Sequence, residues 1–244
     1  MRLDHATWRE VEAYLEKSSG IIIPTGSTEQ HGPMGLIGTD ALCAEKIAWE
    51  AGKELNVYVA PTLAYTPAPF NMSFPGTISI SEELFESLLN EVVFSLKKHG
   101  FKKFYFINGH GANLKSLKNL TNQFSNITIR VKSWWDYEKV DHLRHARFGE
   151  WEGMHATPSE ISITQATNRI VSSNEALSPP KKVSQKYIRD HSGDRHGPPE
   201  QHRSSFPDGR VGSHSVLATP EIGEQLIKSA ASGLVSDYLT VFEI

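Results

Sequence analysis

Short apolar runs alternate with amphipathic, helix-forming segments through the first two thirds of the chain. The clearest run consists of three isoleucines at positions 21–23, and Pro24 and Gly26 end it. A strand with no polar alternation is typical of a sheet that is covered on both faces. Parallel strands need long crossover connections, which are usually helices. The alternation therefore predicts an α/β fold with a mostly parallel central sheet and helices on both faces.

Apolar spacing, capping residues and glycine stops define the expected elements. We expect helices at residues 6–18, 39–55, 81–99, 113–124, 158–170 and 222–239, and strands at residues 21–23, 57–63, 77–80, 104–107 and 127–134. Thr39 and Asp40 are expected to cap the second helix. Residues 172–220 are rich in proline, glycine, serine and histidine and show no periodicity. We expect them to form a long ordered loop or lid, or to be partly disordered.

The composition argues against several classes of function. The 244 residues fit one large domain, so we expect residues 1–244 to form a single domain. Lys and Arg number 25 and Asp and Glu 28, and the net charge of −3 argues against binding to nucleic acid or to an anionic membrane. No run of about 18 apolar residues predicts a membrane span, and the charged N-terminus does not resemble a signal peptide. The single cysteine, Cys43, fits a reducing, cytoplasmic setting.

Candidate metal ligands follow the predicted strand ends, where α/β sheets bind their ligands. After the first strand come Glu29 and His31, which point to the same side in an extended chain, and Asp40 follows at the start of a helix. The strand predicted at residues 104–107 runs into Asn-Gly-His-Gly-Ala-Asn at residues 108–113, which places His110 between two glycines. A last stretch, residues 154–160, leads into a predicted helix. We therefore expect six side chains to meet at the strand ends: Glu29, His31, Asp40, His110, His155 and Glu160.

Histidine and carboxylate ligands together suit Zn²⁺, Mn²⁺ or Fe²⁺ better than Ca²⁺ or Mg²⁺. Two histidines and three carboxylates are enough to hold two ions with one carboxylate between them. Asp40 or Glu160 could be the bridge, and we favour Asp40. Each residue alone has an ordinary explanation, since Asp40 could cap a helix and Glu160 could favour a helix dipole. Their joint occurrence at the ends of one sheet points to a metal site.

The motifs that carry these residues resemble those of the creatininase (creatinine amidohydrolase) family. Residues 24–40 resemble its Gly-Ser-x-Glu-x-His-Gly stretch followed by Thr-Asp, and residues 74–79 look like its Phe-Pro-Gly-Thr stretch. Residues 108–113 resemble its Asn-Gly-His-Gly-x-Asn turn, and residues 155–162 its His-Ala-Gly-x-x-Glu-Thr-Ser stretch. Residues 209–223 resemble a family tail that ends in Ala-Thr-x-x-x-Gly. The matches span most of the chain.

The resemblance implies a three-layer α/β/α fold and two divalent metal ions per subunit. It implies hydrolysis of a C–N bond in a cyclic or small amide. Within it, Glu29, His31, Asp40 and His110 fall on metal-ligand positions, with Asp40 bridging, and His155 falls on the catalytic histidine. Homo-oligomers, often hexamers, are usual in the family, so a homo-oligomer is expected here.

The chain also departs from the family pattern. The family's glycine-rich turn carries a metal-binding glutamate at the position of Ala112, so Glu160 is expected to supply the last ligand. Thr157 and Ile161 replace a usual glycine and threonine, and Met72 replaces a residue that is often histidine. These changes spare the metal ligands and alter the expected substrate pocket. The substrate therefore stays open between creatinine or creatine and a related lactam or formamide.

The predicted activity is that of a metal-dependent amidohydrolase acting on a small-molecule amide. A metal-bound hydroxide would attack the carbonyl, and His155 would protonate the leaving nitrogen. His155 has an alternative role as a third histidine ligand. Trp134 or Trp135 could form a flat wall for the substrate, or either could belong to a core or an interface. The loop histidines are expected to be either solvated or part of a lid: His191, His196 and His202.

Other classes of function fit parts of the sequence. One is a non-catalytic or diverged metal-binding protein of the same fold. Another is nucleotide binding, suggested by Gly109 and Gly111 after a strand, but Leu114 stands where the third glycine of that motif is required. Asp194 and His196 offer the Asp-x-His of a metallophosphoesterase, but no predicted strand precedes them and its partner motif is missing.

Overall fold

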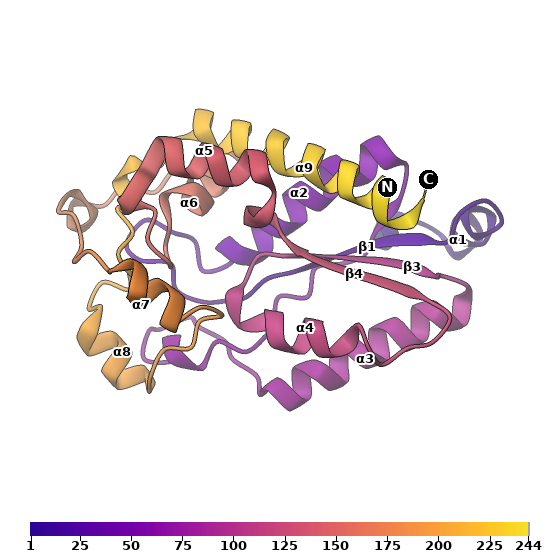
Figure 1. Ribbon diagram of the computed structural model, residues 1–244, viewed down its shortest axis with the longest axis horizontal. Coiled ribbons are helices and arrows are strands. Elements are labelled where there is room, and N and C mark those ends of the chain that lie inside the picture. The colour runs from indigo at the N-terminus through magenta and orange to yellow at the C-terminus, as the bar shows by residue number, and fades with distance from the viewer. Residues whose placement is uncertain (244) are drawn as a thin grey trace.

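A parallel four-stranded sheet lies at the centre of a computed structural model that describes residues 1–243 (Figure 1). The strands lie in the order β2-β1-β3-β4, and each neighbouring pair is parallel. Their bounds are β1 (Gly20–Thr25), β2 (Tyr58–Val59), β3 (Lys103–Asn108) and β4 (Thr128–Ser133). The α/β class predicted from the alternation is confirmed.

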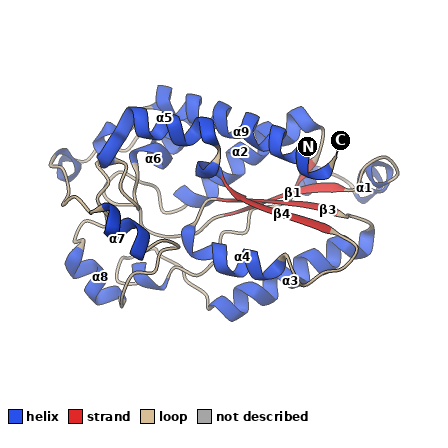
Figure 2. Cartoon of the chain, in the orientation of Figure 1, coloured by secondary structure: helices blue, strands red, loops and turns tan. Residues whose placement is uncertain are grey.

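Helices cover both faces of the sheet (Figure 2). One face carries α2 (Thr39–Leu55), α5 (Glu138–Phe148), α6 (Pro158–Thr167) and α9 (Pro220–Phe242). The other face carries α3 (Glu82–His99) and α4 (Leu114–Leu120), with α1 (Trp8–Leu15) packed at its edge. These layers confirm the three-layer α/β/α arrangement.

Side-chain alternation along β1 explains why both faces are apolar. Ile22 packs into the cluster under α2 and α9, whereas Ile21 and Ile23 pack into the cluster above α3 and α4. All three isoleucines are fully buried, because successive side chains of a strand point to opposite faces. The uniformly apolar run thus encodes a central strand.

The start of α3 has the capping residue that the sequence predicts, whereas the start of α2 does not. The hydroxyl of Ser81 accepts a hydrogen bond from the backbone N–H of Leu84 at the start of α3, and Gly100 ends this helix with φ 113°. The expectation that Thr39 and Asp40 cap α2 is wrong. Gly38 is the capping residue and has no side-chain bond to offer, whereas Asp40 lies in the first turn. Its carboxylate is therefore free for another partner.

Several expected elements are shorter than predicted, and one was not predicted. Only Tyr58–Val59 is strand within residues 57–63, since Pro61 lacks the N–H that a longer pairing needs. Residues 77–80 contribute a single bridge between Ile78 and Thr28. Helices α1, α4 and α6 end three to four residues before their expected ends. Helix α5 escaped prediction because it buries only Val140 and Phe148, which leaves little apolar periodicity.

Residues 172–220 contain short helices that were not predicted from their composition. Two short helices, α7 (Gln185–Asp190) and α8 (Pro199–Ser205), lie beyond the carboxyl ends of the strands (Figure 1). We call residues 185–205 the α7–α8 segment. Short 3₁₀ helices complete the chain at Leu3–His5, Pro69–Asn71, Gly111–Asn113, Trp134–Asp136, Gly149–Trp151, Asn174–Leu177 and Ser215–Leu217. Across residues 1–243, no helix combines the length and apolar character needed to cross a membrane.

The packing of α3 predicts a sharp contrast between two phenylalanines on one helix. Phe85 is fully buried against the sheet, and Phe94 is 59% exposed. Phe85→Ala should lower the free energy of unfolding by about 3–5 kcal/mol, because it removes buried apolar contacts and leaves a cavity. Phe94→Ala, the matched control, should change it by less than about 0.5 kcal/mol. Urea unfolding measures both, and equal effects would contradict the orientation of α3.

Candidate metal centre

The loops after β1 and β3 meet because these strands are neighbours. Thr25 and Asn108, the last residues of the two strands, are paired, and the Thr25 hydroxyl donates a 3.0 Å hydrogen bond to Asn108 Oδ1. His110 follows Asn108 after Gly109. A Cβ atom at position 109 would lie 2.3 Å from the carbonyl oxygen of Asp40. Glycine is thus required there for the first turn of α2 to approach the end of β3.

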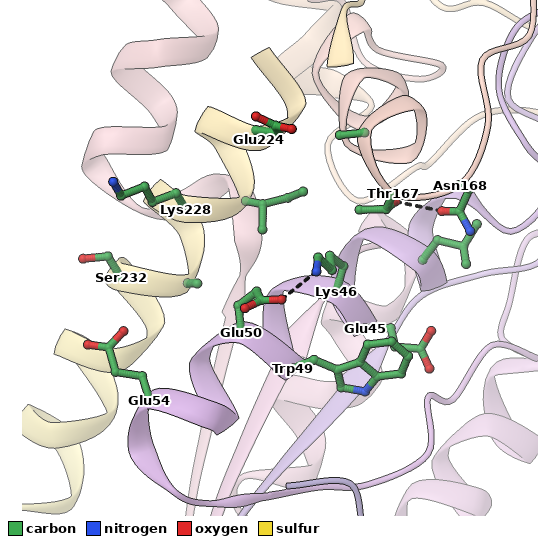
Figure 3. A pocket seen from close by; sticks show the side chains of 14 residues that line it. Glu45, Lys46, Trp49, Glu50, Glu54, Thr167, Asn168, Glu224, Lys228 and Ser232 are labelled. Carbon is green, nitrogen blue, oxygen red and sulfur yellow. Dashed lines mark hydrogen bonds and ion pairs between the residues drawn. The ribbon is translucent and has the colours of Figure 1, made fainter. Parts of the chain in front are cut away.

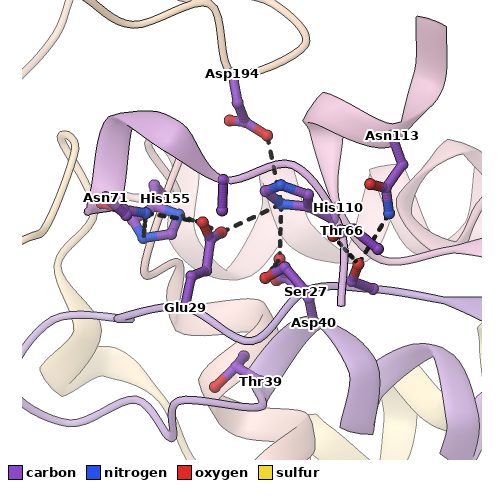
Figure 4. Close-up of polar contacts among 12 residues, drawn as sticks. Ser27, Glu29, Thr39, Asp40, Thr66, Asn71, His110, Asn113, His155 and Asp194 are labelled. Carbon is purple, nitrogen blue, oxygen red and sulfur yellow. Dashed lines mark hydrogen bonds and ion pairs between the residues drawn. The ribbon is translucent and has the colours of Figure 1, made fainter. Parts of the chain in front are cut away.

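Five of the six expected site residues form two overlapping groups of ligand atoms, and the sixth lies beside them. Figure 4 shows Glu29, Asp40, His110 and His155. The ligand atoms within each group lie within 4.8 Å of one another. The first group is Glu29, Asp40 and His110, and the second is His31, Asp40 and Glu160. A further group joins Glu29, His31 and His155. The structure thus brings together the six side chains that the sequence singled out.

Asp40 is shared between the two histidines through its two oxygens. Its Oδ2 lies 2.9 Å from Nδ1 of His110, and its Oδ1 lies 2.8 Å from Nε2 of His31. Glu29 Oε1 lies 3.2 Å from the same His110 nitrogen, and Glu160 Oε1 lies 3.9 Å from the same His31 nitrogen. Each of these imidazole nitrogens thus faces one Asp40 oxygen and one further carboxylate.

The ring nitrogens that point away from the carboxylates are held by backbone oxygens. His31 Nδ1 lies 3.0 Å from the carbonyl oxygen of Glu29, and His110 Nε2 lies 2.8 Å from that of Pro67. A carbonyl oxygen only accepts, so each of these nitrogens carries the proton and donates. This arrangement is typical of metal-binding histidines, since it fixes the ring and frees the opposite nitrogen.

The buried negative charges of these residues need a compensating cation. Glu29, His31, Asp40, His110 and Glu160 are all buried, and no Lys or Arg among residues 1–243 forms an ion pair with them. Glu29 Oε1 is buried and lies near His110 Nδ1, but it accepts no hydrogen bond of good geometry from any of residues 1–243. A buried carboxylate is costly unless a counter-charge compensates it. The donor set of imidazole nitrogens and carboxylate oxygens fits Zn²⁺, Mn²⁺ or Fe²⁺.

The pKa values of these residues also show that the buried carboxylates need a nearby positive charge. Burial alone would lower the pKa of His31, but the Asp40 carboxylate outweighs burial and raises that pKa to about 10. Glu29 and Asp40 likewise overcome burial and raise the pKa of His110 well above its ordinary value. Burial raises the pKa of Glu160 to about 8. Protons therefore occupy the positions from which a divalent cation would have to displace them.

His155 and Glu160 reach the site from a segment that follows α5, and not from a strand end as the sequence suggested. Glu160 also closes a capping box with Thr157 at the start of α6, so its ordinary role and its place in the site coexist. His155 Nε2 lies 2.7 Å from the carbonyl oxygen of Gln30, and its Nδ1 lies 3.8 Å from Glu29 Oε1. Burial and the neighbouring His31 cation hold the pKa of His155 well below its ordinary value.

A cavity of about 450 Å³ opens onto the cluster. Its volume falls within the range of about 300–1,000 Å³ that small-molecule sites occupy. Trp134 is buried and Trp135 half-buried, and both line this cavity. Four of the six site residues also line the cavity: Asp40, His110, His155 and Glu160. Helix α5 contributes Arg144 to the lining, and α7 contributes Ile188 and Arg189.

A larger hollow of about 820 Å³ lies elsewhere, between α2 and α9 (Figure 3). It contains none of the predicted site residues. Its polar groups include a 2.6 Å ion pair between Lys46 and Glu50, with Trp49 alongside. This chemistry is that of a partly solvated helix surface, so the smaller cavity is the candidate site.

Sequence reasoning missed two residues next to the cluster. Asn71 donates a 3.0 Å hydrogen bond to Glu29 Oε2, and Asp194 Oδ2 lies 3.7 Å from His110 Nδ1 (Figure 4). The only signal for Asp194 was its spacing from His196. Of the loop histidines, His196 and His202 are buried around Phe70 rather than solvated, which supports the lid alternative for this segment.

A family model described as creatinine amidohydrolase matches residues 4–237. The chain belongs to the creatininase family. It is thus a hydrolase of that family, and the resemblance predicted from its motifs is confirmed. A solved creatininase aligns over 100% of this chain and 98% of that chain, with a TM-score of 0.76 and 21% identity, and a manganese creatininase aligns with a TM-score of 0.74 at 21% identity. These alignments confirm the fold.

The curated relatives of this chain carry different activities. The 3-dehydro-scyllo-inosose hydrolase of Thermotoga maritima is 32% identical over 106 residues, which cover 43% of this chain and 34% of that protein. The mycofactocin precursor peptide peptidase of Mycolicibacterium smegmatis is 37% identical over 103 residues, covering 40% of this chain and 41% of that protein. The creatinine amidohydrolase of Pseudomonas putida is 25% identical over 205 residues, covering 72% and 78%. The matches to the first two span well under half of those proteins.

The shared position of Asp40 predicts the metal stoichiometry of two variants. Asp40→Asn should lose both ions, because it removes a ligand from each group of donors. Glu160→Gln should lose one ion and retain the other at Glu29, Asp40 and His110. Elemental analysis after dialysis measures the metal per chain. Asp141→Asn, at a half-exposed position of α5, is the control and should match the unmodified protein. Full retention of both ions by Asp40→Asn would exclude the bridge.

Metal binding should release protons at neutral pH. His31 and Glu160, with pKa values of about 10 and about 8, are protonated below those values, and an entering cation must displace their protons. The apparent metal affinity should therefore rise with pH from 6 towards about 8. Calorimetric titration of the chelator-stripped protein with Zn²⁺, in buffers of different ionisation enthalpy, counts the protons released. A count of zero at pH 7 would contradict the protonated state.

Proposed function

We propose that this protein is a metal-dependent amidohydrolase with two divalent ions per subunit, Zn²⁺, Mn²⁺ or Fe²⁺. The observation that carries the proposal is the placement of Asp40, whose two oxygens face different histidines, each beside a further carboxylate. One ion would be held by Glu29, Asp40 and His110, and the other by His31, Asp40 and Glu160. When bound, such ions lower the pKa of a water ligand and polarise a carbonyl oxygen.

The chain's own residues supply orientation and a proton carrier. His155 stands beside both groups, with its ring centroid 4.5 Å from that of His31. Because its pKa is low, His155 is neutral at pH 7 and can accept a proton as the nucleophile forms. It can then deliver that proton to the leaving nitrogen, which is a poor leaving group until it is protonated. Glu29, His31 and His155 also form a ligand group, so a role of His155 as a metal ligand is the alternative.

The proposed substrate is a small or cyclic amide whose C–N bond is hydrolysed. The cavity has room for a molecule of that size, and the half-buried Trp135 offers an apolar wall beside the cluster. The creatinine amidohydrolase and the peptide peptidase among the relatives are both named for substrates that contain an amide-type C–N bond. The substrate is therefore sought among creatinine, creatine, small lactams, formamides and short peptides.

The assembly and setting of the protein are proposed on the family resemblance. We infer a homo-oligomer such as a hexamer, with residues 1–244 as one domain, acting in the cytoplasm without nucleic acid or membrane as a partner. The net charge of −3 and the single buried cysteine support this setting. Light scattering at several protein concentrations measures the number of subunits.

Replacement of His155 separates catalysis from metal binding. His155→Ala should keep both ions and lose about 10²- to 10⁴-fold in turnover, because a positioned proton donor is absent. Hydrolysis of the amide panel and metal content are measured on the same preparation. His145→Ala, at an exposed position of α5, is the control and should keep full turnover. If His155→Ala loses an ion instead, His155 is a ligand, and if no amide is hydrolysed by the metal-loaded protein, the amidohydrolase proposal fails.

A further inference from the structure

The α7–α8 segment carries one carboxylate to the edge of the metal centre. Asp194 Oδ2 lies 3.7 Å from Nδ1 of His110, the nitrogen that faces Glu29 and Asp40 (Figure 4). Two ligands bound to one tetrahedral ion at about 2.1 Å lie about 3.4 Å apart. The separation between Asp194 and His110 is therefore that of two donors that could share a cation. Asp194 belongs to no group of ligand atoms within 4.8 Å of one another, so the segment has to move closer to Glu29 and Asp40 for all of them to bind one ion.

The chain leaves space for this carboxylate at Gly111. A Cβ atom at position 111 would lie 2.2 Å from Asp194 Oδ2, and the three nearest atoms to it all belong to the Asp194 side chain. Gly111 does not have a positive φ, so its backbone conformation suits any residue. Glycine at this position is thus explained by the approach of Asp194 and not by local backbone geometry.

Within residues 1–243, only imidazoles lie near the Asp194 carboxylate as basic groups. Its side chain is 12% exposed, and its nearest basic nitrogens are His110 Nδ1 at 3.7 Å and His196 Nε2 at 3.8 Å. Within residues 1–243, no Lys or Arg pairs with it, and no group donates a hydrogen bond to its carboxylate. His196 behind it is 1% exposed, and neither ring nitrogen has a hydrogen-bond partner. An almost buried carboxylate without a donor is unfavourable unless a cation lies beside it.

We propose that Asp194 is a ligand of the ion held by Glu29, Asp40 and His110, and that this bond closes the α7–α8 segment over the centre. The inference rests on the metal centre of the proposed function and adds a fourth protein donor to it. His196 is a positioning residue, because its Nε2 faces the other oxygen of Asp194, Oδ1. Closure would form one wall of the cavity, which Asp194 and Arg189 line together.

Metal retention tests the proposal without any substrate. Asp194→Asn should release metal to a chelator at least about 10-fold faster than the unmodified protein, because one charged ligand is lost. Asp190→Asn is the matched control in the same segment, since Asp190 is half-exposed and pairs with Lys186. Release is followed with a colorimetric chelator on the Zn²⁺-loaded protein. Equal release rates for Asp194→Asn and the unmodified protein would overturn the proposal.

Gly111→Ala provides a second, independent variant. It keeps every carboxylate but fills the space that Asp194 occupies, so it should accelerate metal release as Asp194→Asn does. Combining the two substitutions should add little, because both break one interaction. Circular dichroism and thermal unfolding of the metal-free proteins check that each variant is folded. Additive effects of the two substitutions would show that Gly111→Ala acts elsewhere and would contradict the proposal.

Closure of the segment gives a further readout. Zn²⁺ should slow protease cleavage within residues 185–205 of the unmodified protein and of Asp190→Asn, but not of Asp194→Asn. Glu29→Gln tests the metal centre independently of Asp194. If Glu29→Gln binds metal normally, the proposed centre itself is wrong. If Glu29→Gln loses metal while Asp194→Asn keeps both its metal and its Zn²⁺-dependent protection, only the role of Asp194 is wrong.

Discussion

The structure depends on one electrostatic constraint, the burial of several carboxylates beside two imidazoles with no Lys or Arg in the described part of the chain paired to them. Asp40 stands at its centre, since its two oxygens contact His31 and His110. Removing these charges from water is expensive, and their mutual attraction compensates only if the cluster holds enough positive charge. Protons on the histidines can supply that charge, and so can two divalent cations. The pKa values of His31 and His110 are raised because the neighbouring carboxylates stabilise the protonated imidazoles.

The sheet makes such a cluster possible because it removes conformational freedom before the charges meet. Thr25 and Asn108 fix the ends of β1 and β3 side by side, and Gly109 lets the start of α2 approach them. The apolar clusters on both faces of the sheet hold these elements in place. Like charges can therefore be held close together, because the packing of the scaffold opposes their separation.

The α7–α8 segment has a different character from this scaffold. It lies beyond the strand ends, and Asp194 reaches His110 while His196 and His202 pack around Phe70. The scaffold thus supplies rigid donors, and the segment supplies one wall of the cavity.

The sequence by itself determined the fold class and the members of the cluster. Uniformly apolar runs such as residues 21–23 encode a buried parallel sheet, and the motifs at Glu29, Asp40 and His110 follow its strand ends. Only the tertiary structure decided how the donors divide, with Asp40 between two histidines, and that Asp194, far along the chain, lies 3.7 Å from His110. It also corrected the cap at Asp40 and revealed helix α5. The reason is that periodicity and motifs report local environment, whereas the distance between side chains remote in sequence depends on how the whole chain packs.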